Sequence, residues 1–238
     1  MKLATVCIAG LLQFPAWAQA NDGLMPEGSV DAVVSVLVGS RPLDPGSTAR
    51  TAFVLPQFFV EWSNGVFIDG LAAGVKLSSD PLLQFGPLVA LGRGPRTDGA
   101  GHRMRPALGA FVNVTPFHEL TLHARVMAPA VRHGRGGMLT MDAATHTQLA
   151  PHHVLAANIG LNLADAGYLQ SEFGTAGHQP SGGVRDVYAG VRWHWEMSRK
   201  VKLTASVQAS VLQGAAAASP RTVQRTGVTS WLALGYHF

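Results

Sequence analysis

The chain has 238 residues, a length typical of one domain, with 47% hydrophobic and 13% charged residues. This charged fraction is well below the ~25% of soluble domains, yet beyond the N-terminus no run reaches the ~18 apolar residues that a membrane-spanning helix requires. The formal net charge of +4 is scattered rather than gathered into a basic run, which argues against nucleic acid as a partner.

Residues 1–20 have the pattern of a secretory signal peptide. A lysine supplies the positive start, Leu3–Phe14 is largely apolar, and small residues at alternate positions permit cleavage after Ala18 or Ala20. The apolar run is too short to remain in the membrane as an anchor. We therefore expect an exported protein whose mature chain, residues 21–238, forms a single domain.

Strand periodicity is clearest in residues 201–212. One face of this segment is apolar and carries Val201, Leu203, Ala205, Val207, Ala209 and Val211. The other face is polar and carries Lys202, Thr204, Ser206, Gln208 and Ser210, with Leu212 as the exception. A helix does not keep a period of two over eleven residues, so this pattern predicts a strand with one polar face and one apolar face.

The C-terminal third of the chain repeats this pattern. Residues 186–197 alternate in the same way, and a short turn at residues 198–200 joins them to the next strand. The chain ends with aromatic and aliphatic residues on one face, a pattern that resembles the terminal signature read by the outer-membrane assembly machinery: Leu232, Leu234, Tyr236 and Phe238. Together with a signal peptide, these strands favour an outer-membrane barrel over a soluble sandwich.

Weaker alternation marks the other expected strands, at residues 31–39, 51–62, 65–78, 82–92, 108–114, 120–128, 137–147 and 155–163. The total is eleven, whereas bacterial single-chain barrels have an even number of strands. Large aromatic residues near strand ends include candidates for the interfacial girdle: Trp62, Trp193, Trp195, Trp231 and Tyr236.

Splitting residues 65–78 at Gly70 restores an even number. It also places residues 41–48 on the extracellular side, together with the long connections at residues 93–103, 131–136, 164–182 and 214–224. We therefore predict an all-β protein, a closed antiparallel transmembrane β-barrel of about 12 strands. The alternative is 10 strands, if the N-terminal segment lies outside the barrel.

Charged residues on the polar faces of these strands are candidates for lining the lumen. They are Arg125, Asp186, Arg192, Glu196 and Lys202. Two arrangements remain open: the residues line a pore, or they pair across the lumen and plug it, because buried charges need partners. A barrel of ten to twelve strands is narrow enough for side chains to fill much of its interior.

Several motifs resemble those of the MipA/OmpV family of outer-membrane proteins, which is named for interaction with the murein transglycosylase MltA. Near the N-terminus, Pro45–Ser47 is followed by Val54–Pro56 and then by Gly65–Phe67, in the order of the family's motifs. Near the C-terminus the matching segments are Tyr168, Gly182–Asp186 and Leu212–Pro220. The resemblance covers most of the mature chain.

The resemblance implies a non-enzymatic barrel that anchors a murein-remodelling complex of transglycosylase and synthase at the outer membrane. A small pore or an adhesin-like surface protein is the alternative. The chain departs from the family at Ala215 and Ala218, where aspartates are frequent, and this puts in doubt any partner or cation that those carboxylates bind.

Arginines in the expected extracellular connections are candidates for contact with lipopolysaccharide phosphates, which guanidinium groups bind in a bidentate way: Arg93, Arg96, Arg103, Arg132 and Arg135.

Catalytic and metal sites are not expected. Adjacent His152 and His153 would point to opposite faces of a strand, so they cannot chelate one ion. Cys7, the only cysteine, lies in the predicted signal peptide, and no cofactor is expected.

Overall fold

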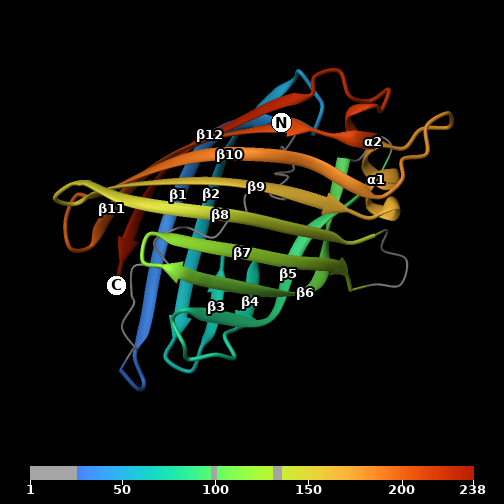
Figure 1. The fold of residues 1–238 in the computed structure, drawn as a ribbon. Coiled ribbons are helices and arrows are strands. Elements are labelled where there is room, and N and C mark those ends of the chain that lie inside the picture. Colours follow the sequence, from blue (N-terminus) through green and yellow to red (C-terminus); the bar gives the residue numbers. More distant parts are fainter. Residues whose placement is uncertain (1–25, 98–100, 131–135) are drawn as a thin grey trace.

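The computed structural model describes residues 26–97, 101–130 and 136–238. Within these residues the chain forms twelve strands and two short helices, arranged as one barrel (Figure 1). No helix among them is long and apolar enough to cross a membrane. The predicted signal peptide, residues 1–20, lies outside the described residues and stays a prediction.

The strands follow one another around the barrel in sequence order. Their bounds are β1 (Val30–Pro42), β2 (Arg50–Trp62), β3 (Val66–Asp69), β4 (Ala72–Val75), β5 (Leu83–Thr97), β6 (Gly101–Phe117), β7 (Leu120–Pro129), β8 (Met138–Ala150), β9 (His153–Ala164), β10 (Gly183–Glu196), β11 (Val201–Leu212) and β12 (Thr226–His237). Helix α1 (Ala166–Phe173) follows β9, and α2 (Gly214–Ala217) follows β11. All pairs are antiparallel, which confirms the predicted closed barrel of twelve strands.

Side chains alternate between the lipid and the interior along each strand. In β11, Thr204 and Ser206 are buried in the interior, whereas Val207 points outward and is exposed. The neighbouring β10 and β12 add Val191 and Leu232 to the same outer surface. Exposed apolar side chains around the barrel form the surface that faces hydrocarbon, as the sequence periodicity predicts.

Pairing of the first and last strands closes the barrel. The β1–β12 ladder runs from the Val33–His237 pair to the Ser40–Ser230 pair. We assign the end of the barrel with the short turns to the periplasm, as in other bacterial barrels. At this end, His237 Nε2 lies 2.5 Å from Asp31 Oδ1. This contact joins residues that are 206 positions apart, so it depends on closure of the barrel.

The split at Gly70 is confirmed, and it produces an unusually short hairpin. Gly70 turns the chain between β3 and β4 with a φ of 56°, a left-handed conformation that suits glycine. Its N–H donates to Phe58 O at 2.7 Å, and Leu91 N–H donates to Leu71 O at 2.9 Å. The hairpin therefore covers only the periplasmic part of the wall between β2 and β5 (Figure 1).

The extracellular end differs from the sequence prediction in two places. Residues 93–103 were expected to be a loop, and this expectation is wrong, since β5 continues to Thr97 and β6 begins at Gly101. Their paired backbones extend the hairpin beyond its apolar segment. The connections at residues 164–182 and 214–224 do lie at this end, but each contains a helix that was not predicted.

The aromatic residues near strand ends divide between the two surfaces of the barrel. Trp193 and Trp195 lie on the outer face of β10, and each stacks with His153 at a centroid distance of 5.6 Å. They suit the periplasmic interface of the membrane, as an aromatic girdle requires. Trp231 instead packs against the interior cluster of Leu37 and Phe53.

We predict that Glu61→Gln destabilises the barrel by about 1–2 kcal/mol, because it weakens the contact that holds the end of β2 to the end of β4. Lys76 Nζ and Glu61 Oε1 are 2.5 Å apart, and both side chains are largely buried. Urea unfolding of vesicle-inserted protein measures the effect. Asp80→Asn in the same connection is the control, and an equal loss in both variants would contradict the prediction.

Candidate functional site

A cluster of charged side chains occupies the middle of the barrel interior. Arg125 on β7 and Arg192 on β10 both interact electrostatically with Asp69 on β3 and Asp142 on β8. These four residues come from different sectors of the wall, so their charges attract one another across the interior of the barrel. Two guanidinium groups and two carboxylates have no net formal charge, which favours mutual pairing over an open charged channel.

Neutral side chains connect this central cluster to the wall. Gln57 Nε2 donates to Asp69 Oδ1 at 3.2 Å, and Tyr188 Oη donates to Asp142 Oδ1 at 3.2 Å. The Tyr188 ring lies over Gly160, where an added Cβ would come within 2.6 Å of the ring. The missing side chain at Gly160 therefore makes room for the tyrosine and positions its hydroxyl at the carboxylate.

A second polar group lies nearer the extracellular end. Asp186 Oδ1 accepts a hydrogen bond from Asn162 Nδ2 at 2.7 Å, and Asn162 Oδ1 accepts one from Thr140 Oγ1 at 2.7 Å. Arg185 also donates to Asp186, and it reaches Tyr168 Oη on α1 at 3.1 Å. Asp186 thus links three strands of the wall to the helix over the mouth.

The remaining predicted lumen residues lie at the periplasmic rim. Glu196 and Lys202, on adjacent strands, form an ion pair of 3.1 Å, and His152 lies 3.8 Å from the same carboxylate. Above them, the buried His194 Nδ1 is 3.0 Å from Thr204 Oγ1. The five predicted residues therefore occupy three separate levels of the barrel and do not form a single site.

Sequence reasoning missed the partners of these charges. Asp69 belongs to a four-residue strand, which is too short to reveal its face by alternation. Asp142, Tyr188 and Asn162 do stand on polar faces of predicted strands, at alternate positions with outward apolar residues. Alternation could have selected these three, but it could not have shown which of them approach one another across the barrel.

The two helices form a packed group over the extracellular mouth. Leu169 and Phe173 of α1 pack against Ala216 of α2 and Leu212 at the end of β11. Ser219 Oγ donates to Phe173 O at 2.6 Å and thereby connects the two long loops. Helix α1 also contacts β5, although β6, β7 and β8 separate β5 from β9 around the wall, so α1 and the end of β5 come together over the mouth.

The arginines expected to contact lipopolysaccharide are only partly placed. Arg93 and Arg96 belong to β5 and Arg103 to β6, so they stand on a strand hairpin instead of a loop. Arg132 and Arg135 lie outside the described residues. Contact with lipopolysaccharide remains a prediction for all five. Among the described residues, no three His, Cys, Asp or Glu side chains are grouped in a way that could hold a metal ion.

The structure is thus a closed barrel with short periplasmic turns, charged side chains of both signs in its interior and helices over its outer mouth. A sequence model of the family described as MltA-interacting protein MipA matches residues 34–238. The chain belongs to the MipA family. This agrees with the resemblance of the sequence motifs, and it establishes an outer-membrane barrel. No curated protein matches the chain at a significant level.

Solved outer-membrane barrels share the fold of this MipA-family chain at low identity. The NanC porin is 12% identical, with 85% of this chain and 98% of that chain covered and a TM-score of 0.51. A bacterial polysaccharide outer membrane secretin is 9% identical, with 87% and 98% covered and a TM-score of 0.51. These similarities support the barrel architecture.

We predict that Asp165→Ala loosens α1 and costs about 1–2 kcal/mol of local stability, as loss of a helix N-cap does. Asp165 Oδ1 accepts from Tyr168 N–H at 2.7 Å, and Oδ2 accepts from Gly137 N–H at 2.7 Å. Hydrogen exchange over residues 166–173 should become faster. The control, Asp80→Ala, removes a similar cap from a periplasmic turn, and unchanged exchange in Asp165→Ala would contradict the prediction.

Proposed function

We propose that this chain is a non-enzymatic scaffold that holds a murein transglycosylase, and through it a murein synthase, at the periplasmic face of the outer membrane. Membership of a family named for its interaction with MltA carries the proposal. The family name states a binding partner and no reaction, which supports a binding role. Anchoring requires only a stable barrel with an accessible periplasmic surface.

The interior supports a role in anchoring more than a role in transport. Arg125 and Arg192 attract Asp69 and Asp142 electrostatically inside the barrel, and α1 contacts β5 over the outer mouth. Opposite charges that attract one another across the interior help to hold the wall together and reduce the net charge that a passing solute would meet. A scaffold gains rigidity from such pairs, whereas a general pore needs water along its axis.

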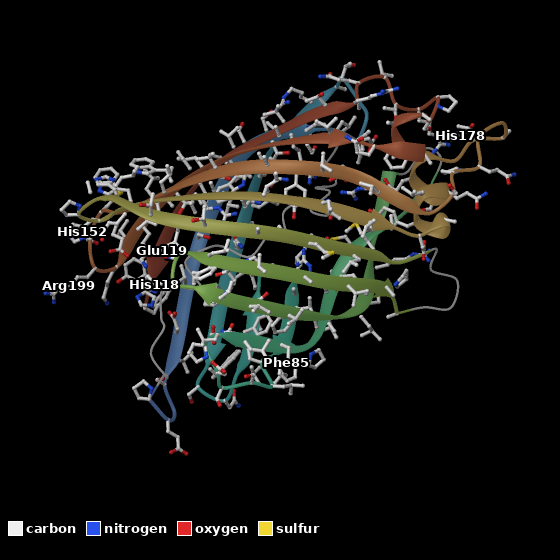
Figure 2. All side chains as sticks on the ribbon, in the orientation of Figure 1. Phe85, His118, Glu119, His152, His178 and Arg199 are labelled. Atoms are coloured by element: carbon white, nitrogen blue, oxygen red, sulfur yellow. The ribbon has the colours of Figure 1, made fainter. Side chains whose placement is uncertain are left out.

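The periplasmic rim is the surface that such an enzyme can reach. We define this rim as the turns at residues 63–65, 118–119, 151–152 and 197–200. Figure 2 shows His118, Glu119, His152 and Arg199 at this end of the barrel, far from His178 at the opposite end. Charged and imidazole side chains on the rim favour one orientation of the bound enzyme and increase the rate at which it associates with the barrel.

We predict that Arg199→Glu/Lys200→Glu weakens capture of the transglycosylase by about tenfold or more, because reversal of two rim charges opposes a complementary partner. Both side chains are exposed on the turn between β10 and β11. Pulldown of the transglycosylase from solubilised membranes measures the effect. Arg221→Glu/Arg225→Glu makes the same charge change at the extracellular end and should retain capture.

The outcome of this pulldown is decisive in two ways. If the native chain captures no more transglycosylase than an unrelated barrel does, the scaffold proposal is wrong. If both double variants lose capture equally, the partner does not dock on the turn between β10 and β11. Heat-modifiable gel mobility identifies folded protein in every sample, since a folded barrel migrates anomalously until it is boiled.

A small pore is the second candidate function, and the polar inner wall formed by β7 to β11 favours it. Planar-bilayer recording separates the two proposals. A plugged scaffold predicts no steady conductance for the native chain and a measurable conductance for Arg125→Ser/Arg192→Ser, which shortens two central side chains. Steady native conductance that changes in Arg192→Gln would instead support the pore.

A further inference from the structure

The barrel wall has a break in its hydrogen-bond ladder beside the short hairpin. Strand β3 pairs with β2 only through Phe59–Glu61, and β4 pairs with β5 only through Leu88–Ala90. Beyond the hairpin tip, β2 continues to Arg50 and β5 continues to Thr97. Within the described residues, neither of these extensions has a strand partner on the side that faces the other.

Exposure on β2 agrees with a missing neighbour. Val54 and Val38 are partners in the β1–β2 ladder and both point outward, but Val54 is 63% exposed and Val38 is 44% exposed. Val38 has a strand on each side, because β12 continues the wall beyond β1. Val54 lacks a strand on the β3 side, but Ile159 of β9 is 66% exposed with a strand on each side, so it is the interrupted ladder that defines the break.

The sequence of β2 disfavours pairing of another strand with the edge of β2 in this break. Phe58 O points toward the hairpin, since it accepts from Gly70 N–H, and residues two positions apart in a strand point the same way. Pro56 therefore presents a ring and no N–H donor to the break. Prolines protect sheet edges from pairing, so a strand from a second copy is a poor occupant.

The wall around the break carries two apolar clusters on its inner face, beside the polar pair of Gln57 and Asp69. One cluster, from β1, β2 and β12, consists of Leu37, Phe53, Leu55 and Ala233, with Trp231 packed against it. The other, from β3 to β6, consists of Phe67, Ala72, Leu88, Ala90 and Phe111, with Met127 packed against it. An alkyl chain that passes between β2 and β5 meets apolar side chains from both clusters, which favours its transfer from water or headgroups.

Two arginines flank the break at its extracellular end. Arg41 lies on β1, in register with Thr51 of β2, and its guanidinium is 5.6 Å from the centre of the Phe53 ring. Arg105 lies on β6, in register with Gly92 of β5. Each arginine is therefore one strand away from the break, on opposite sides. Guanidinium groups bind carboxylates and phosphates well, so an anionic head suits this end.

We propose that the break is a side entrance for a single-chain anionic amphiphile dissolved in the outer leaflet. Its alkyl chain passes between β2 and β5 and lies against the two apolar clusters, while its head stays near Arg41 and Arg105. Helix α1 and β5 meet over the extracellular mouth, so the wall gives this ligand a more direct route than the mouth does. Two absent strands leave about 14 Å between the axes of β2 and β5, which is wide enough for an alkyl chain.

The test uses 12-bromododecanoate as the probe, because bromine quenches tryptophan fluorescence at short range. The protein is reconstituted in phosphatidylcholine vesicles with Trp62, Trp193 and Trp195 replaced by phenylalanine, which leaves Trp231 as the reporter inside the described barrel. The expected result is saturable quenching of Trp231. Quenching that rises linearly with probe would reflect partition into the bilayer alone and would overturn the proposal.

Two alanine substitutions separate entry through the break from general binding. Ala90→Phe places a ring on the inner face directly below the break, whereas Ala156→Phe places the same ring on β9 in the opposite wall; both alanines are buried. Apparent affinity should fall about tenfold in the first variant and stay unchanged in the second. Leu55→Asn replaces Ala90→Phe if that variant does not fold. An equal effect in both walls would overturn the proposal.

The role of the two arginines in binding the head group is tested by comparing an anionic probe with a neutral one. Arg41→Gln/Arg105→Gln should weaken binding of 12-bromododecanoate about tenfold and leave binding of the neutral 12-bromododecanol unchanged. Folding of each variant is checked by heat-modifiable mobility. If the double variant binds both probes as the native chain does, the anionic head is not recognised at this end and the proposal fails in that part.

Discussion

Every peptide group of a strand that crosses lipid needs a hydrogen-bond partner, because hydrocarbon offers none and an unpaired group costs several kcal/mol. In this chain the β1–β12 seam meets that need for the two terminal strands. The β3–β4 hairpin meets it only as far as Gly70, and above that point Pro56 removes one donor from the edge of β2. Closure at the seam therefore satisfies this requirement, whereas the break above the hairpin departs from it, and Pro56 reduces the cost by one donor.

The short hairpin also shapes the interior. Its tip carries Asp69, which interacts with Arg125 and Arg192 from the far wall, and Gln57 on β2 holds the same carboxylate. The hairpin therefore carries both a charge that attracts the arginines of the far wall and the apolar side chains of Phe67 and Ala72. A scaffold function and a ligand site in the wall are compatible, because the periplasmic rim and the break lie at different levels of the barrel.

The candidate site was only partly visible in the sequence. Alternation placed Arg125 and Arg192 on inner faces, since their neighbours are apolar and outward. It could not place Asp69, whose strand has four residues. Helix α1 was missed although Asp165 stands at its N-cap, because burial of Leu169 and Phe173 against the other loop stabilises this short helix, and that contact is not local in sequence.

The two-residue period, the turn at Gly70 and the aromatic C-terminus were enough to predict a closed barrel of about twelve strands, with ten as the alternative, since a side chain's face in a strand depends only on its position. Family motifs in the same sequence were enough to indicate the MipA family. Only the tertiary structure decided how far β3 and β4 extend, which charges meet inside and which loops cover the mouth. These depend on register and on contacts between distant segments, which local periodicity does not encode.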